Sequence, residues 1–327
     1  MSVLTAFIHP IDSESIQYAA ELLRQGKLVA MPTETVYGLG ADASNPEAVA
    51  KIFAAKGRPA DHPLIVHLAY AAQMRDWASD VTDAALALAQ AFWPGPLTLI
   101  LPKKASVPLQ VTGGQETIAL RVPAHPAALW LLRSFGGGIA APSANRFGRI
   151  SPTLASHVAE ELGDAVDCIL DGGPCRVGVE STILDLTDRQ PTILRPGRIT
   201  RGQLETALQA DVALKSQHKI RAPGMLAAHY APQTPALLCD RALLIDEFDR
   251  LCAQGRTVGV LSFSTGLAAW PCEHKRHLPA KPEDYESGLY HALRELDKLP
   301  LDTILVERPP LDDAWLAVND RLSKATV

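Results

Sequence analysis

The stretch of residues 31–67 constrains the fold of this chain more than any other. The apolar residues 28–31 read as a buried strand, and Pro32 ends that run. Gly38 and Gly40 follow where the backbone is expected to turn, because glycine adopts conformations that other residues avoid. The pattern predicts a strand that runs into a glycine-containing loop.

A well-marked helix is expected after this loop. Asn45 is a good N-cap, Pro46 suits the first helical position, and Gly57 stops the helix after Lys56. Lys56 and Arg58 then lie on either side of Gly57, which predicts two cations at the rim of a threonine-rich loop. Together they suit a phosphate, since lysine is a point charge and arginine a two-pronged fork. The alternative is a solvated helix end, where cations offset the helix dipole.

Composition bounds the class of protein. The chain has 327 residues, of which 47% are hydrophobic and 20% charged, so a soluble protein with one large and one small domain is expected. No apolar run approaches the roughly 20 residues of a membrane helix, and no export signal is seen, which predicts a cytoplasmic protein with no membrane partner. Five widely spaced cysteines fit reduced thiols. The net charge of -5 argues against nucleic-acid binding as the main task.

Periodicity predicts the domain organisation. Helices and short apolar strands alternate irregularly over residues 1–208, which predicts an α/β domain on a mixed twisted sheet. Residues 209–235 lack periodicity and carry several prolines, as in a semi-rigid linker. Residues 236–327 predict a small, Rossmann-like α/β domain. Its expected strands are 237–239, 258–263 and 303–306, and its expected helices are 240–254 and 285–296.

Two long sequence blocks are specific: Pro-Thr-Glu-Thr-Val-Tyr-Gly-Leu at 32–39 and Lys-x-Arg-Pro at 56–59. Together they resemble the signature of one known family, the YrdC-like threonylcarbamoyl-AMP synthases. His229-Tyr230-Ala231-Pro232 is similar to the linker of the longer family form, which has an extra C-terminal domain. The resemblance covers essentially the whole chain and implies a concave sheet with a large open cavity. The remaining matching blocks lie at 141–145, 179–183 and 194–197.

The resemblance also implies an activity. Members of the family are nucleotidyltransferases that convert L-threonine, bicarbonate and ATP to threonylcarbamoyl-AMP and pyrophosphate. This is the first step towards threonylcarbamoyladenosine at position 37 of tRNAs that read ANN codons. A tRNA threonylcarbamoyl transferase would take the product. Mg²⁺ is expected to arrive with ATP, because it binds phosphates readily and the blocks contain no dense carboxylate cluster.

The family's ATP site maps onto residues spread over the whole chain. Lys56 and Arg58 are implied to contact the phosphates and to carry catalysis by neutralising charge. Members commonly have Asn where this chain has His62, and Tyr230 is implied to close the cavity over the ligand. Turn formation is the alternative role for Ser143 and Asn145, and surface exposure for Arg195. The full predicted ATP-binding set is Lys56, Arg58, His62, Thr117, Ser143, Asn145, Ser151, Arg195 and Tyr230.

A threonine subsite is implied as well. Arg121 would clamp the carboxylate of the amino acid, although a structural ion pair is the alternative. His67 lies on an apolar strand, where the default is a satisfied core histidine. The predicted subsite comprises Thr35, His67, Arg121, the backbone of Ala141, and Ser181.

Two other functional classes are compatible with parts of this pattern. A related domain occurs in hydrogenase-maturation carbamoyltransferases, but this chain lacks their added N-terminal regions. A non-catalytic RNA-binding module is the other class, and a weak tRNA contact could also accompany catalysis. The motif Gly38-x-Gly40-x-x-Ala43 fits a dinucleotide fingerprint only loosely, because the helix is expected to start later, at Asn45. No P-loop is present.

Overall fold

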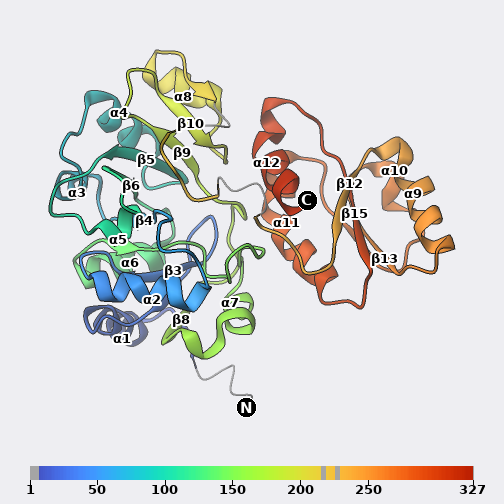
Figure 1. The fold of residues 1–327 in the computed structure, drawn as a ribbon, viewed down its shortest axis with the longest axis horizontal. Helices are drawn as coiled ribbons and strands as arrows, with labels where there is room; N and C mark the ends of the chain where they lie inside the picture. The colour runs from blue at the N-terminus through green and yellow to red at the C-terminus, as the bar shows by residue number, and fades with distance from the viewer. Residues whose placement is uncertain (1–6, 215–218, 225–228, 327) are drawn as a thin grey trace. The chain divides into compact units, whose positions relative to one another are not determined.

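The structure is a computed structural model that describes residues 7–214, 219–224 and 229–326 (Figure 1). The chain forms two compact units. The boundaries expected at 208 and 235 stay predictions, and residues 215–218 and 225–228 of the expected linker lie outside the described residues. The first unit comprises Met1–Phe147, Pro152–Arg176 and Glu180–Met225, and the second comprises Gly148–Ser151, Val177–Val179 and Leu226–Val327.

The first unit is built on a mixed sheet of 11 strands in the order β1-β8-β2-β3-β7-β4-β6-β5-β9-β10-β11. Parallel pairs such as β4 with β6 alternate irregularly with antiparallel pairs such as β5 with β6, which confirms the predicted fold class. The strands are β1 (Ile8–Pro10), β2 (Val29–Met31), β3 (Gly38–Asp42), β4 (Ile65–His67), β5 (Leu97–Pro102), β6 (Thr117–Arg121), β7 (Ile139–Ala140), β8 (Cys168–Asp171), β9 (Thr182–Asp185), β10 (Thr192–Arg195) and β11 (Ala213–Leu214).

The helix α2 (Pro46–Lys56) begins and ends at the signals expected from the sequence. The Asn45 side chain caps α2 by accepting from the backbone N–H groups of Glu47 and Ala48, and Gly57 ends it in the left-handed conformation at φ 63°. Short 3-10 turns lie at Ala71–Gln73 and Gly163–Ala165. The helices are α1 (Ser13–Arg24), α2 (Pro46–Lys56), α3 (Met74–Trp77), α4 (Asp83–Phe92), α5 (Leu109–Thr112), α6 (Pro126–Phe135), α7 (Ala155–Leu162) and α8 (Arg201–Leu208).

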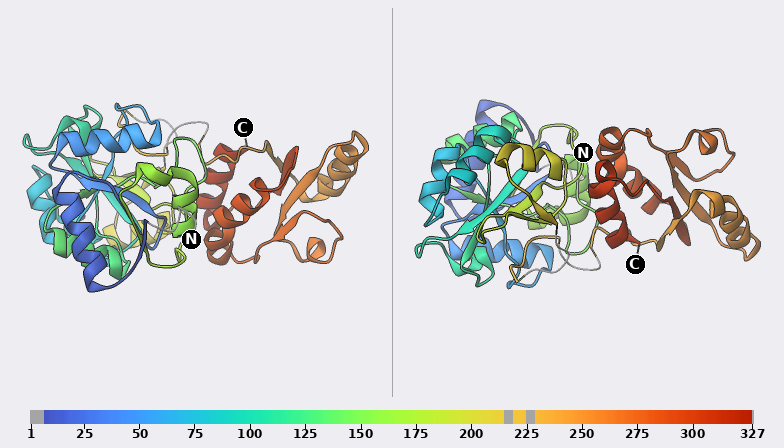
Figure 2. Two further views of the ribbon diagram at one scale, coloured as in Figure 1. Left: turned by 90° about the horizontal axis from the view of Figure 1, so that it is seen from below. Right: turned by 90° about the horizontal axis from the view of Figure 1, so that it is seen from above.

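The two faces of the sheet are covered differently. One face carries the main core, to which α2 contributes. On the other face α1 and α6 pack over β2, β7 and β8, so α1 and α2 lie on opposite sides of the sheet (Figure 2). A separate apolar cluster lies further along that second face, on β4, β5, β6 and β9. It comprises Ile65, Ile100, Ala119, Ile183, Leu194 and Ala222, with Ile220 packed against it.

Strand register then places two polar side chains beside this cluster. Ile65 pairs with Ala119, and two residues later His67 pairs with Arg121. Because side chains alternate along a strand, His67 and Arg121 share the face of the apolar cluster.

One local prediction is wrong. Gly38 and Gly40 do not form a turn but lie within β3, which is buried between β2 and β7. A Cβ at Gly40 would lie 2.8 Å from Ile139 Cγ2 and 3.0 Å from Val29 O. Glycine is therefore needed here for close packing of the strands rather than for chain reversal.

The second unit has a four-stranded sheet in the order β12-β15-β13-β14, with all pairs parallel. It confirms the expected small α/β domain. Its strands are β12 (Ala236–Cys239), β13 (Val258–Ser262), β14 (Lys275–His277) and β15 (Thr303–Glu307). Its helices are α9 (Arg241–Ala253), α10 (Thr265–Ala268), α11 (Pro282–Asp297) and α12 (Leu316–Ala325), with a 3-10 turn at Asp313–Trp315.

Two short segments from the middle of the chain belong to this second unit. Arg149 Nη2 lies 2.9 Å from Asp297 Oδ2, and Arg294 donates a hydrogen bond to the backbone oxygen of Ile150. Gly178 has φ 81°, and a Cβ there would lie 2.5 Å from Glu286 O. These contacts fix 148–151 and 177–179 onto α11.

All five cysteines are free thiols, as expected. Within the described residues, no helix is both long and apolar enough to cross a membrane.

Candidate active site

Lys56 joins two of the signature blocks. It is the last residue of α2 and only 3% exposed, and its Nζ donates hydrogen bonds to the backbone oxygens of Ser143 and Asn145. Burial, and next the nearby Arg58 guanidinium, hold the pKa of Lys56 well below its ordinary value. Lys56 is therefore not part of a solvated helix end. It is a buried amine whose charge a nearby anion would stabilise.

The loop after β7 is held against the threonine-rich segment. Leu39 N donates to Pro142 O at 2.8 Å, and Ala144 N donates to Tyr37 O at 2.8 Å. Gly38 and Ser143 also form an isolated antiparallel bridge. The 141–145 block and the 32–39 block, more than 100 residues apart in the sequence, therefore lie side by side.

Arg58 and His62 lie on the short loop that follows α2. Arg58 Nη2 donates to Pro63 O at 3.0 Å, which bends the arginine back over its own loop. The ring centroids of His62 and Phe147 are 5.4 Å apart. Burial, and then the positive charge of Arg58, lower the pKa of His62. A neutral His62 beside Arg58 leaves the arginine as the cation of this loop.

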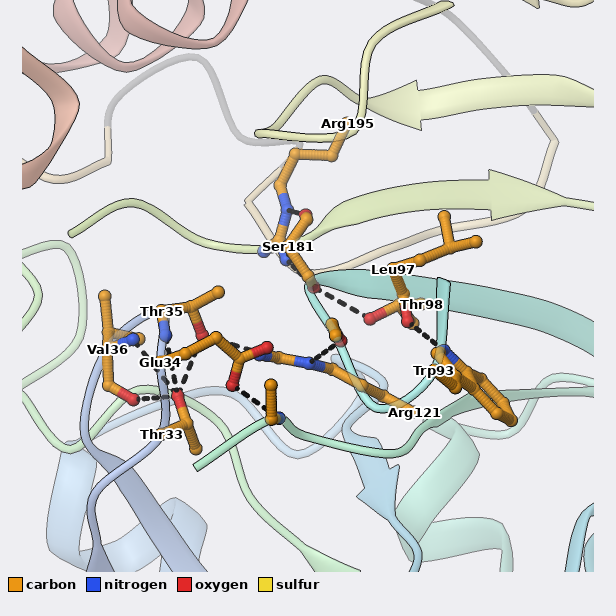
Figure 3. A network of polar contacts seen from close by, with 12 residues as sticks. Thr33, Glu34, Thr35, Val36, Trp93, Leu97, Thr98, Arg121, Ser181 and Arg195 are labelled. Carbon is orange, nitrogen blue, oxygen red and sulfur yellow. Dashed lines mark hydrogen bonds and ion pairs between the residues drawn. The ribbon is translucent and has the colours of Figure 1, made fainter. Parts of the chain in front are cut away.

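Arg121 is the centre of a buried polar network (Figure 3). Its Nη1 donates to Thr35 Oγ1 at 2.9 Å, its Nε donates to Gly95 O at 3.1 Å, and its Nη2 lies 2.6 Å from Glu34 Oε1. Glu34 also accepts from the backbone N–H of Ala124 at 3.0 Å. The ion pair that was the alternative role for Arg121 is thus present. It does not exclude the carboxylate clamp, because a guanidinium has five N–H groups.

Ser181 and Arg195 form the neighbouring part of the network (Figure 3). Thr98 Oγ1 and Ser181 Oγ are 2.8 Å apart. Arg195 donates from Nη2 to both Ser181 O at 2.9 Å and Ser181 Oγ at 3.1 Å, and from Nη1 to Pro223 O at 3.2 Å. Arg195 is therefore a buried residue of the site region rather than a surface arginine, since it is 3% exposed.

His67 lies beside Arg121 on the adjacent strand. It is 2% exposed, and burial followed by the charge of Arg121 lowers its pKa to about 3. Its Nδ1 has no hydrogen-bond partner among the described residues. His67 is accordingly a neutral imidazole at physiological pH, suited to hydrogen bonding rather than to proton transfer.

The structure gives the positions of four other predicted site residues, Ala141, Thr117, Ser151 and Tyr230. The backbone N–H of Ala141 donates to Ile65 O at 2.9 Å, so the strand pairing already uses that donor. Thr117 opens β6, four residues before Arg121 and on the same face. Ser151 and Tyr230 belong to the second unit, and their predicted contacts with the nucleotide stay predictions.

Sequence reasoning missed two residues of the network. Glu34 is 4% exposed, and the available signal was a charged residue within the Thr-Glu-Thr motif, three residues after the end of β2. Thr98 is fully buried, and its signal was a single polar residue within the apolar run of β5. Each contacts a predicted site residue: Glu34 pairs with Arg121, and Thr98 is hydrogen-bonded to Ser181.

The described residues contain no group of three or more histidine, cysteine, aspartate or glutamate side chains that could hold a metal ion. The only carboxylate in the network of Figure 3, Glu34, is engaged by Arg121.

Comparison with known proteins assigns the chain to a family. Residues 21–197 match the family described as Telomere recombination, and residues 199–327 match the one described as Threonylcarbamoyl-AMP synthase, C-terminal domain. Threonylcarbamoyl-AMP synthase of Pyrococcus abyssi is 42% identical over 337 residues, covering 100% of this chain and 98% of that protein. The Bacillus subtilis threonylcarbamoyl-AMP synthase is 45% identical over 322 residues, covering 95% and 92%.

A solved structure agrees with these sequence matches. The crystal structure of P. abyssi Sua5 complexed with L-threonine superposes with a TM-score of 0.90 at 42% identity, covering 98% of this chain and 96% of that one. Both the sequence and the fold match over essentially the full length of the two units. The chain therefore belongs to the family of two-domain, Sua5-type threonylcarbamoyl-AMP synthases.

Proposed function

We propose that this protein condenses L-threonine, bicarbonate and ATP into threonylcarbamoyl-AMP and pyrophosphate, and so supplies tRNA N6-threonylcarbamoyladenosine modification. The observation that carries the proposal is the buried network in which Arg121 binds Thr35 and Glu34, with His67 beside Arg121 on the sheet face of the apolar cluster. A relative 42% identical to this chain has been crystallised with L-threonine.

The reaction needs no nucleophilic side chain. The amine of threonine attacks bicarbonate, and loss of water leaves a carbamate. A carbamate oxygen then attacks the α-phosphorus of ATP, and the bond from that phosphorus to the bridging oxygen breaks to release pyrophosphate. Charge accumulates on the phosphates, so catalysis depends on positioning and on cations.

The residues divide between the two substrates. In this proposal Thr35, His67, Arg121, Ser181 and the backbone of Ala141 hold threonine, with Arg121 directed at its carboxylate. The neutral imidazole of His67 accepts or donates one hydrogen bond without carrying charge.

The triphosphate would lie along the second group of residues. Lys56 and Arg58 face the phosphates, helped by Arg195, while His62, Thr117, Ser143, Asn145 and Ser151 line the rest of the nucleotide site. The substrate is taken to be the magnesium complex of ATP. The labile adenylate must be kept from water, which is the role proposed for the linker residue Tyr230.

Pyrophosphate release tests the proposal directly. Purified protein is given MgATP with both threonine and bicarbonate, or with either one omitted. Release is expected only when both are present, and the product should be threonylcarbamoyl-AMP. Release without threonine would reject the proposal, and stimulation by carbamoyl phosphate instead would favour the hydrogenase-maturation chemistry.

Partners and location follow from the same reaction. We propose that the adenylate passes to a tRNA threonylcarbamoyl transferase, which places the reaction in the cytoplasm, where tRNA is modified. Salt-dependent binding of tRNA in the absence of MgATP and threonine would indicate a direct RNA contact.

A further inference from the structure

Residues 219–223 of the expected linker pack within the first unit, beside the candidate site. We call residues 219–223 the strap. Ile220 and Ala222 pack on the apolar cluster of the sheet face, which includes Ile65, Ala119 and Ile183. The strap therefore covers the face that also carries His67 and Arg121.

Polar contacts hold the middle of the strap in one register. Arg221 N donates to Gln115 Oε1 at 2.7 Å, and Gln115 Nε2 donates to Arg221 O at 3.0 Å. One side-chain amide thus satisfies both backbone groups of Arg221, much as a neighbouring strand would.

The Arg221 side chain connects the strap to the loop that carries Arg58. Its Nη1 donates to Asp61 Oδ2 at 2.9 Å, and its Nη2 donates to Gly113 O at 2.7 Å. Gly113 itself supports the same loop, because a Cβ there would lie 2.3 Å from Asp61 O. Arg221 therefore holds both Asp61 and the residue on which Asp61 packs.

The end of the strap is joined to the threonine subsite. Pro223 O accepts from Arg195, whose Nη2 also binds Ser181. Two arginines thus connect one five-residue segment to both predicted subsites, Arg221 to the Arg58 loop and Arg195 to Ser181.

We propose that Arg221 is a positioning residue for ATP: by linking the strap to the loop of residues 58–63 through Asp61 and Gly113, it places Arg58 for the triphosphate. The inference rests on the proposed function for the identity of the ligand. The Arg221–Asp61 pair is half exposed, with side-chain exposures of 49% and 61%. Such a pair stabilises little, which suits a contact that must form and release during turnover.

Steady-state kinetics test the positioning role. Arg221→Ala is expected to raise KM for MgATP by about fivefold, the effect of losing one exposed charge-assisted contact, with kcat and KM for threonine within about twofold. Arg221→Lys should fall between, because it keeps the charge but cannot reach two acceptors in a fork. The matched control is Arg308→Ala, which removes the Arg308–Asp240 pair of the second unit, exposed by 41% and 62%.

Limited trypsin digestion tests strap docking without catalysis. Asp61→Asn and Gln115→Ala leave Lys219 and Arg221 intact as cleavage sites, and both variants should be cut faster at Lys219 than wild type. MgATP should protect the wild type more than Asp61→Asn. Asp240→Asn is the control and should behave as wild type.

The possible outcomes distinguish failure of the proposed role of Arg221 from failure of the proposed function. Wild-type KM values in Arg221→Ala, or unchanged cleavage in both strap variants, would overturn the inference while leaving the proposed function intact. Should Arg221→Ala not fold, the two digestion variants decide. A wild-type protein that releases no pyrophosphate would instead reject the proposed function, and the ligand-free digestion would still show whether the strap is held by these contacts.

Discussion

Burial changes the proton affinity of two residues of the candidate site in ways that the sequence could only partly indicate. The blocks predicted that Lys56 and His67 belong to the site, but not that Lys56 is enclosed by the carbonyl groups of Ser143 and Asn145. That enclosure depends on a loop nearly 90 residues away in the chain, and local pattern carries no information about it. The Glu34–Arg121 ion pair is likewise a product of tertiary packing.

Lys56 should take up a proton when the triphosphate binds. Its pKa in the free protein lies well below 10.5, and an adjacent polyanion favours the ammonium form, so the pKa rises on binding. At about pH 9.5, one unit below the ordinary lysine value, calorimetric titration with a non-hydrolysable ATP analogue in two buffers of different ionisation enthalpy measures this uptake.

Two matched variants test whether Lys56 is the group that takes up the proton. Lys56→Arg keeps a charge that does not titrate and should bind without proton uptake. Lys51→Met, altered on the same helix, should match wild type. Equal uptake by wild type and Lys56→Arg would show that Lys56 does not face the phosphates.

His67 should make the protein sensitive to acid. Its folded pKa of about 3 lies below the 6.5 of an unfolded histidine, so the unfolded state binds more protons between these values and stability falls as pH drops below 6.5. By pH 4 the loss attributable to His67 is about 3 kcal/mol. Urea denaturation of wild type and His67→Gln at pH 7 and pH 4 measures the difference, and an equal loss in both proteins would contradict it.

At the scale of elements, the sequence predicted best where local signals and tertiary packing agree. The helix α2 has the predicted caps at Asn45 and Gly57. The strand β3 was missed because its glycines resemble a turn, although packing against β2 and β7 requires them. β14 was missed because Lys275–His277 is a polar edge strand with no apolar alternation.

Two glycines beside the loop of residues 58–63 should respond differently to substitution by alanine. Gly57 has φ 63°, and a Cβ added there would meet no atom within 4 Å, so Gly57→Ala should cost only about 1 kcal/mol of stability. Gly113 has φ 59°, but a Cβ would lie 2.3 Å from Asp61 O, so Gly113→Ala must displace the Arg58 loop and should cost about 3 kcal/mol.

Urea denaturation and KM for MgATP together check this pair. Gly113→Ala should raise KM for MgATP, whereas Gly57→Ala should leave it near the wild-type value. Equal effects of the two substitutions on both quantities would mean that the Gly113 contact does not support the loop.

At the scale of the whole molecule, the sequence indicated two α/β domains and a linker with a functional tyrosine. The surroundings of that tyrosine within its own unit were not predictable. Tyr230 adopts φ 62°, the Arg321 guanidinium lies 5.2 Å from its ring centroid, and the Tyr290 ring stacks at 5.9 Å. Arg321 is buried on the terminal helix α12, an element that no sequence signal had indicated.

Tyr230→Ala should uncouple ATP consumption from product formation. If Tyr230 closes the cavity over the adenylate, its removal admits water, and more pyrophosphate is released per threonylcarbamoyl group transferred. The ratio of pyrophosphate to transferred product measures this, with Tyr230→Phe as the control that keeps the ring. An unchanged ratio in Tyr230→Ala would show that Tyr230 does not protect the adenylate from water.

The second unit includes residues 148–151 and 177–179 from the middle of the chain, so loss of the C-terminal part of the gene would also affect these two loops. Deleting the codons after position 225 would leave two internal loops without the helix α11 on which they pack, including Gly178, which approaches Glu286 closely. A one-domain descendant would therefore have to acquire new codons at both places. Relatives with and without the C-terminal unit should therefore differ in sequence at residues 148–151 and 177–179 as well as in the C-terminal region.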